Sequence, residues 1–343
     1  MKKNRLWIGW TAFLSVLACV SILGYIVTPD HTPYCNEQIL EIRLQKPGSK
    51  ISFIKIEKGG NVEKKGFFKR MLFGQPNPYT LIPISSYRIS EDSVHVRILN
   101  EPDYTGLKSY ARSEVAGFVK RTFLLGTDRY GRDLLSQMII GARVSLSIGF
   151  VSVCIALFIG IIIGAIAGYF GGKTDNIILW FINVVWSVPS LLLVIAISFV
   201  LGSGFWQIFI AIGLTMWVDI ARVVRGQFIS LREKDYVEAS RALGFHNSTI
   251  IFKQILPNIT GTLTVISASN FASAILMEAG LSFLGIGVQP PMPSWGNMIK
   301  ENYGYIILDY AYLAVIPGIA IVLLVLSFML IGNSIRDNLE IKY

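Results

Sequence analysis

Apolar residues gather in six long runs along this chain, and each run is long enough to form a helix that crosses a membrane. A bilayer core needs about 20 mainly apolar residues in helical form. The expected spans cover residues 6–27, 138–168, 176–201, 205–223, 258–279 and 311–333. The first run is long for the core of a signal peptide and lacks a small-residue cleavage site, so we expect it to remain as a span. The pattern predicts an all-α polytopic membrane protein with six transmembrane helices.

Residues 30–122 follow a different pattern, in which apolar and polar positions partly alternate. The segments QILEIRL, KISFIKIE and SVHVRIL alternate in the way that is typical of half-buried strands. The segments KPGSK, EKGGN and GQPNP are clusters of turn residues. We therefore expect a small β-rich insert between the first and second helices. Its basic residues are compatible with contact to anionic lipid or to a partner, but mixed charge is also ordinary on a solvated surface.

The positions of the basic residues predict the orientation of the spans. Short cytoplasmic loops carry an excess of Lys and Arg, whereas long loops cross the membrane largely regardless of charge. Basic residues precede the first span, separate spans four and five, and follow span six: Lys2, Lys3, Arg5, Arg222, Arg225, Arg232, Lys234, Arg241, Lys253, Arg336 and Lys342. We therefore expect cytoplasmic N- and C-termini and an extracytoplasmic insert. The expected domains are 1–29 (tail and first helix), 30–122 (insert) and 123–343 (transmembrane domain), with a cytoplasmic loop at 224–257.

Composition agrees with a membrane protein and argues against an enzyme. Of the 343 residues, 52% are hydrophobic and 15% are charged, against about 25% charged in soluble domains. The three cysteines and three histidines show no disulfide framework, metal-ligand spacing or catalytic pairing, so no cofactor, metal or nucleic acid is expected. Cys35 is the one cysteine outside the apolar runs.

One segment, AGYFGGKT at 167–174, fits a loose form of the phosphate-binding P-loop. A P-loop follows a strand and opens a helix of a soluble α/β domain. Here an apolar run lies on each side of the segment. We therefore interpret it as a glycine turn between two spans.

The polar stretch DYVEASRALGFHNSTIIFKQILP at 235–257 predicts two short helices joined by a turn. Asp235 is the expected cap of the first helix, and Gly244 supplies the left-handed residue that ends it. Asn247 or Ser248 caps the second helix, and Pro257 stops or kinks it. The apolar face is short and interrupted, so a protein-docking elbow explains the stretch better than a helix lying on the membrane. Its small residues allow close approach of another surface: Ala239, Ser240 and Ala242.

Charged residues near the bilayer are the remaining candidates for function. Asp219 lies inside the fourth run, but Arg222 is one turn away and is expected to pair with it. Glu278 lies near the outer end of the fifth run, where it either lines a translocation path or reaches the interface. Ahead of the second run, GTDRYGRD places Asp128 four residues before Arg132, and Arg129 four residues before Asp133, as ion pairs if the segment is helical.

Several blocks of the chain resemble the permeases of binding-protein-dependent ABC importers. EASRALG, followed by ILP, resembles their EAA loop. The blocks LGTDRYGRDLLSQMIIGARVSLSIG, GYFGG, EAGLSFLGIGVQPPMPSWGNMI and RDNL resemble the second, C-type permease of the dipeptide and oligopeptide branch. The resemblance covers the first span and then residues from about 123 to the end. Ser240 stands where alanine is usual, and the insert is far longer than the usual connector.

The resemblance implies a fold like that of type I ABC importer permeases and a set of partners. These are a homologous second permease, two cytoplasmic ATPase subunits, an extracytoplasmic solute-binding protein and the lipids of a bacterial cytoplasmic membrane. ATP hydrolysis is expected in the ATPase subunits, and peptides are expected to be imported by alternating access. The coupling residues it implies are Glu238, Ala239, Ser240, Gly244, Ile255, Leu256 and Pro257. Transport of another solute such as nickel, or a membrane sensor with an outer ligand domain, remain alternatives.

Overall fold

The computed structural model describes residues 6–59, 65–100, 107–202 and 204–340. The chain divides into two compact units. The helical unit contains residues 1–16, 145–289 and 319–343, and the sheet unit contains residues 17–144 and 290–318.

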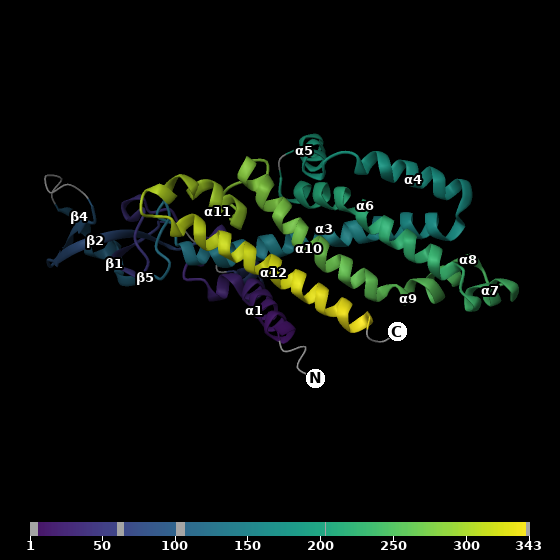
Figure 1. Cartoon of the computed structure of the whole chain (residues 1–343). Helices are drawn as coiled ribbons and strands as arrows, with labels where there is room; N and C mark the ends of the chain where they lie inside the picture. The colour runs from purple at the N-terminus through teal and green to yellow at the C-terminus, as the bar shows by residue number, and fades with distance from the viewer. Residues whose placement is uncertain (1–5, 60–64, 101–106, 203, 341–343) are drawn as a thin grey trace. The chain divides into compact units, whose positions relative to one another are not determined.

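Five helices in the described part of the chain are long and apolar enough to cross a membrane (Figure 1). They are α1 (Leu6–Val27), α3 (Leu134–Phe170), α6 (Phe205–Arg232), α10 (Thr260–Leu284) and α12 (Tyr312–Glu340). They correspond to five of the six predicted spans, although α3, α6, α10 and α12 extend further than expected. The chain is therefore a mainly helical, multi-pass membrane protein.

The third predicted span, 176–201, is not one straight helix. It is divided between α4 (Gly172–Trp186) and α5 (Ser190–Leu201), which are bent by 89°. Pro189 lies at the break, where it has no N–H to donate and disfavours helical geometry in the residue before it. The described part of the chain therefore has five helices that are long and apolar enough to cross a membrane, or six if the bent pair makes one crossing.

A seam of glycines on α3 packs against α6 in the helical unit. Gly160, Gly164 and Gly168 recur every four residues and so share one face of the helix. A Cβ atom at Gly164 would lie 2.5 Å from the carbonyl oxygen of Ala221, and one at Gly168 would lie 2.6 Å from that of Arg225. Small residues at such positions let helix backbones approach closely in a membrane. The seam therefore fixes α3 against the helix that leads to the elbow.

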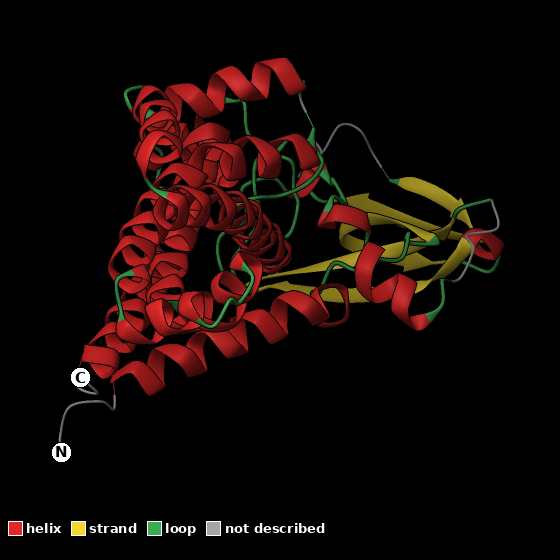
Figure 2. Ribbon diagram, turned by 90° about the vertical axis from the view of Figure 1, so that its right-hand side faces the viewer, coloured by secondary structure: helices red, strands yellow, loops and turns green. Residues whose placement is uncertain are grey.

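The sheet unit contains one antiparallel sheet of five strands, in the order β4-β3-β2-β1-β5 (Figure 2). In chain order the strands are β1 (Ser49–Glu57), β2 (Tyr79–Ile89), β3 (Ser93–Ile98), β4 (Lys108–Ala111) and β5 (Val115–Phe123). They fall between α1 and α3 in the chain, as the alternating pattern predicts. KISFIKIE and SVHVRIL contribute to β1 and β3.

The segment QILEIRL, expected to be a strand, instead contains a short 3₁₀ helix, Leu40–Ile42. Its backbone N–H groups are used elsewhere: Ile39 donates to the carbonyl of Tyr130, and Leu44 to that of Asp128. Ile42 is fully buried among β1, β2 and β5 side chains. The segment therefore supports the loop before α3 and does not add a strand to the sheet.

A short helix that the sequence analysis did not anticipate, α2 (Phe67–Phe73), lies in the sheet unit and exposes aromatic side chains. Arg143 of α3 donates hydrogen bonds to the carbonyls of Met71 and Leu72 at its C-terminal end, and to those of Ser21 and Ile22 on α1. One guanidinium group thus joins three helices through backbone carbonyls.

One of the two ion pairs expected ahead of the second span is present, on a turn and not on a helix. Arg132 Nε lies 2.6 Å from a carboxylate oxygen of Asp128, and Arg132 Nη2 lies 2.6 Å from Glu301. The second expected pair does not form. Asp133 accepts hydrogen bonds from Ser136, and Arg129 lies over the ring of Tyr130.

Candidate functional site: the elbow and the α5–α6 pocket

The polar stretch 235–257 forms an elbow of short helices between α6 and α10. The first is α7 (Asp235–Ala242), followed by Gly244 with a φ of 76°. The second part contains α8 (Asn247–Thr249), a π-helical turn (Ile250–Ile255) and α9 (Leu256–Asn258). The turn at Gly244 was predicted, because a left-handed residue ends a helix with least strain when it is glycine.

The helix caps differ from the predicted ones. Lys234 occupies the N-cap of α7 and Asp235 is its first residue, where a carboxylate still favours the positive end of the helix. His246 is the cap of α8, and its imidazole accepts from the N–H of Ser248. Pro257 lies within α9, just before the backbone changes direction at Ile259.

Hydrogen bonds between side chains hold the two halves of the elbow together. Gln254 donates to the hydroxyl of Ser240 at 2.7 Å, and Asn258 donates to the hydroxyl of Tyr236 at 3.1 Å. Alanine at position 240 could not accept the bond from Gln254. Ser240, which stands where alanine is usual, therefore helps to hold the two halves of the elbow together through its hydroxyl group.

The elbow is also attached to the end of α3. The hydroxyl of Tyr169 donates to Asn247 at 2.8 Å, and the guanidinium of Arg241 lies 5.0 Å from the centre of the Tyr169 ring. Arg232 donates to the carbonyl of Gly168 at 3.0 Å. Contacts of Tyr169 therefore join the elbow to the end of α3, and Arg232 joins the end of α6 to the same part of α3.

The predicted coupling residues do not all face outward. Glu238, Ala239, Gly244 and Pro257 are exposed, Leu256 is half-buried, and Ser240 and Ile255 are buried. The hydroxyl of Ser240 is used inside the elbow, and close approach of another surface at this position stays a prediction.

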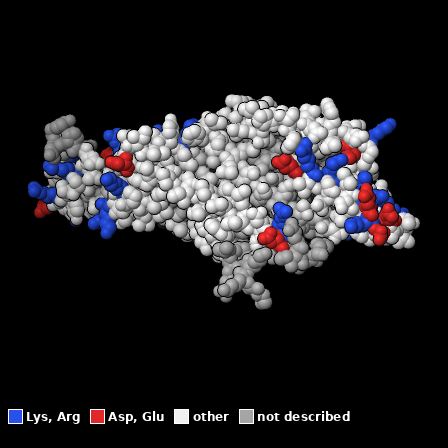
Figure 3. All heavy atoms as spheres, in the orientation of Figure 1, with Lys and Arg blue, Asp and Glu red and all other residues white. Residues whose placement is uncertain are grey.

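Three apolar side chains add a surface that the sequence analysis missed. Leu243 is 78% exposed, Phe252 65% and Phe245 50%. Acidic and basic side chains gather around the same helices, as Figure 3 shows. Large apolar residues inside an otherwise polar loop were the signal that could have identified this surface.

Inside the helical unit, Asp219 is not paired with Arg222. Arg222 instead donates to the amide oxygen of Asn183 at 2.7 Å, and its guanidinium lies 3.9 Å from the centre of the Trp186 ring. Among the described residues, none forms a hydrogen bond or ion pair with Asp219. Asp219 is exposed and lines a pocket of about 210 Å³ at the bend between α4 and α5.

Glu278 is buried within α10, with 1% of its surface exposed. It accepts a hydrogen bond at 2.8 Å from Ser282, whose hydroxyl also accepts from the N–H of Val288. Its contacts join the end of α10 to the loop that follows. A role in a translocation path stays a prediction.

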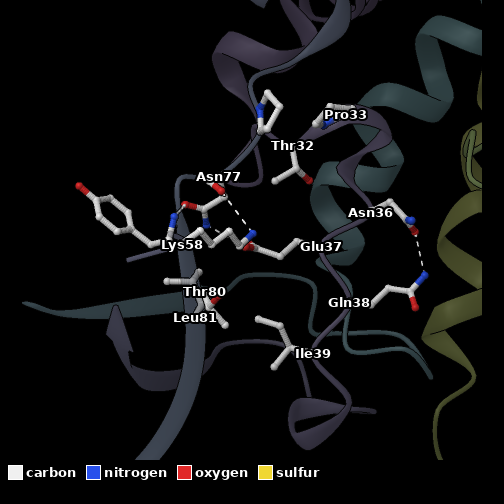
Figure 4. A pocket seen from close by; sticks show the side chains of 12 residues that line it. Thr32, Pro33, Asn36, Glu37, Gln38, Ile39, Lys58, Asn77, Thr80 and Leu81 are labelled. Carbon is white, nitrogen blue, oxygen red and sulfur yellow. Dashed lines mark hydrogen bonds between the residues drawn. The ribbon is translucent and has the colours of Figure 1, made fainter. Parts of the chain in front are cut away.

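The sheet unit contains a larger pocket, of about 420 Å³ (Figure 4). Its one acidic wall residue among those described, Glu37, already binds Asn77 at 2.8 Å and Arg121 at 2.9 Å. Lys58 donates to the carbonyl of Asn77. Glu37 and Lys58 therefore hold the loops together. Neither charged group of the described lining is left without a partner for a ligand to bind.

Two acidic groups and a thiol beside this region are buried. Burial raises the pKa of Asp30 and of Asp133 above the usual value, despite the hydrogen bonds that each carboxylate accepts. Burial likewise raises the pKa of the Cys35 thiol, which has none of its surface exposed. Cys35 is therefore protonated and shielded, and its position outside the apolar runs does not make it accessible.

The segment that resembles a P-loop joins two helices. Gly171 and Gly172 have φ values of 65° and 55°, and Lys173 follows in the first turn of α4. The helix α3 precedes this turn, where a P-loop requires a strand. The interpretation as a glycine turn is confirmed.

A bundle of apolar helices that carries a polar helical elbow on its surface defines a membrane component of a transport machine. Residues 160–342 match the family described as the binding-protein-dependent transport system inner membrane component. The chain belongs to this family.

Three relatives give the scale of the similarity. The chain is 38% identical over 218 residues to the glutathione transport system permease protein GsiD of Pectobacterium atrosepticum, covering 64% of this chain and 72% of that protein. It is 39% identical over 217 residues to the oligopeptide transport system permease protein OppC of Bacillus subtilis, covering 63% and 71%. It is 42% identical over 221 residues to the di/tripeptide transport system permease protein DppC of Pseudomonas aeruginosa, covering 64% and 72%.

Among solved structures, the fold is similar to a chain of the MetNI methionine ABC transporter in its inward-facing conformation. The TM-score is 0.50 at 20% identity, and the match covers 60% of this chain and 97% of that chain. This similarity supports the fold of the helical part of the chain.

Proposed function

We propose that this chain is the second, C-type permease subunit of an ATP-driven importer of di- or oligopeptides. Its partners are then a homologous second permease, two cytoplasmic ATPase subunits and an extracytoplasmic solute-binding protein. Relatives named as peptide permeases support the substrate class. The chain itself is not catalytic in this proposal, and ATP hydrolysis occurs in the ATPase subunits.

The observation that carries the mechanism is the elbow. Its exposed side holds Glu238, Leu243 and Phe245, while hydrogen bonds and buried Ile250 and Ile255 keep it rigid. A rigid surface of this kind suits docking of an ATPase subunit, whose movement then turns α3, α6 and α10 together. Such rocking of helices about a central site is how alternating access works in transporters.

Basic residues support a cytoplasmic elbow and cytoplasmic termini. From the N-terminus to the elbow, the chain passes through α1, α3, the α4–α5 pair and α6. The basic tail and the basic elbow lie on the same side only if the bent α4–α5 pair makes one crossing. The sheet unit's strands then lie on the outer side.

The test of orientation uses cysteines placed at exposed positions in a chain that lacks Cys19, Cys35 and Cys154. Ser248→Cys on the elbow should react with an impermeant thiol reagent only from the cytoplasmic side, and Ser113→Cys beside β5 only from outside. Reaction of both positions from the same side would overturn the proposed crossing of α4–α5.

The test of coupling uses two variants of the elbow in the reconstituted complex. Gly244→Val forces a β-branched residue into a left-handed conformation, which costs about 1–2 kcal/mol locally, and Glu238→Lys reverses an exposed charge. Each should reduce co-purification of the ATPase or uptake of labelled peptide at least about tenfold. Gly244→Val misdirects the second half of the elbow, and for Glu238→Lys like charges across an interface cost several kcal/mol. Glu91→Lys, an exposed reversal beside β3, is the control. Wild-type association and uptake in both elbow variants would contradict the proposal.

A further inference from the structure

The pocket at the α4–α5 bend combines apolar walls with one unpaired carboxylate. Its described lining comes from the end of α4, the start of α5 and one face of α6: Val185, Trp186, Val188, Pro189, Ser190, Leu193, Thr215, Val218 and Asp219. Among these residues only Asp219 carries a charge. Arg222, the expected partner of Asp219, instead donates to Asn183 and lies over the ring of Trp186, which itself lines the pocket.

An ionised side chain inside a membrane span is costly, and such residues usually mark a substrate or ion path. Asp219 lies within α6, inside the expected span 205–223 and toward its cytoplasmic end. It lines the pocket at the place where a crossing segment is broken into two helices. In transporters, substrate sites are often formed by such discontinuous helices.

We propose that this pocket binds a cationic group of the transported solute, with the Asp219 carboxylate as the counter-ion. The inference rests on the proposed transport of peptides, because a peptide with a free N-terminus carries an ammonium group. Trp186 and Leu193 supply the apolar and aromatic wall beside that group. At about 210 Å³ the pocket is smaller than the roughly 300–1,000 Å³ that encloses a whole drug-sized ligand. It therefore takes the end of a peptide, and the rest of the chain extends into the path.

The first experiment measures charge preference at the pocket without requiring transport. Ser190→Cys is introduced into the complete, reconstituted complex, in a chain whose native cysteines are replaced by alanine. Ser190 is exposed and lines the pocket, so its replacement should react with both a cationic and an anionic methanethiosulfonate. With Asp219 present, the cationic reagent should react about tenfold faster than the anionic one, as expected for an opposite charge a few ångströms away.

Two comparisons identify Asp219 as the source of this preference. Asp219→Asn should abolish it, and Asp219→Glu should retain it. Ser187→Cys is the matched control, because Ser187 is exposed on the same bend but does not line the pocket. Its preference for the cationic reagent should be markedly weaker. An equal preference at both positions, or one that survives Asp219→Asn, would overturn the proposal.

The second experiment measures uptake of a labelled dipeptide with saturating binding protein. Asp219→Asn should lower uptake about tenfold and leave ATP hydrolysis and assembly unchanged, while Asp219→Glu should retain uptake. Loss of the second permease from the purified Asp219→Asn complex would instead show that Asp219 pairs with that subunit, and would overturn the proposal. Charge preference without dipeptide uptake by the wild-type complex would refute the proposed peptide transport but leave the cation pocket standing.

Discussion

In the sheet unit, Arg132 and Arg143 are each enclosed by several partners, whereas in the helical unit Asp219 is open to a pocket. Arg132 binds two carboxylates, and Arg143 binds four backbone carbonyls. The long helices α3 and α6 are joined by close contact at glycines. Buried arginines with several partners therefore join segments of the sheet unit, whereas close packing at glycines joins two long helices in the helical unit. In the helical unit, the exposed charges of Glu238 on the elbow and of Asp219 are available for function.

The largest expected effect tests the ion-pair network of the sheet unit. Arg132→Met leaves the buried Asp128 and the partly buried Glu301 close together without a cation, which should destabilise the protein by about 3–5 kcal/mol. Burial by itself would lower the pKa of Arg132, but Asp128 and Glu301 raise it, so the guanidinium stays charged. Thermal unfolding of the purified chain in detergent measures the change. Arg129→Met, which removes a neighbouring cation without such a pair, is the control and should change stability far less.

The second effect tests whether the helical unit depends on its glycine seam. Gly164→Ala places a methyl group against the carbonyl of Ala221 and the side chain of Val224, and overpacking of this kind costs about 1–3 kcal/mol. Gly226→Ala on α6 is the matched control, because nothing lies within 4 Å of its added carbon. That control should be neutral or slightly stabilising, since alanine favours a helix by about 1 kcal/mol over glycine. Equal thermal stability of the two variants would show that the seam does not hold α3 to α6.

A smaller effect tests the fastening inside the elbow. Ser240→Ala removes the acceptor for Gln254 and should cost about 0.5–1.5 kcal/mol. The double variant with Gln254→Leu should recover part of this loss, because both polar partners are then absent. A double-mutant cycle in unfolding experiments measures the coupling, and additive losses would contradict a direct bond.

The smallest effect concerns the pH dependence of the sheet unit. Because the folded-state pKa of Asp30 is raised by burial, its contribution to stability is present below the unfolded pKa and is lost as pH rises through the folded value. Asp30→Asn removes this titration and keeps an acceptor for the N–H of Thr32. The stability of the variant relative to wild type should therefore increase from pH 4 to pH 8. A decrease over that range, measured by thermal unfolding, would show that the ionised carboxylate stabilises the fold.

The sequence predicts the long helices well, because an apolar run of sufficient length has few alternatives in a membrane. Pro189 is a sequence signal for a break in the helix. The apolar residues on both sides of it nevertheless led to the prediction of one continuous span. The prediction of a strand at QILEIRL was wrong, although its apolar and polar residues alternate. Ile39 and Ile42 face the core, but the backbone N–H groups donate to a loop far along the chain and not to a neighbouring strand.

For the candidate site, the turn at Gly244 followed from local backbone preference and was correct. The roles of Ser240 and Arg222 depend on residues distant in sequence, Gln254 and Asn183, which spacing along one helix cannot reveal. Arg222 was the nearest candidate partner of Asp219 along the helix, but in the structure Arg222 binds Asn183. Long-range contacts thus decided which polar residues remain free for function.

The glycine seam also has a consequence for the biogenesis of the protein. Gly168 and its neighbour Arg225 are 57 residues apart in the chain (225 − 168), and the face of α3 that carries the seam is synthesised before its partner. At about 5–20 residues per second, α6 follows roughly 3–11 seconds later. During that interval the exposed backbone of α3 must be accommodated by lipid or by the insertion machinery. The contact between α3 and α6 can therefore form only after α6 has been synthesised.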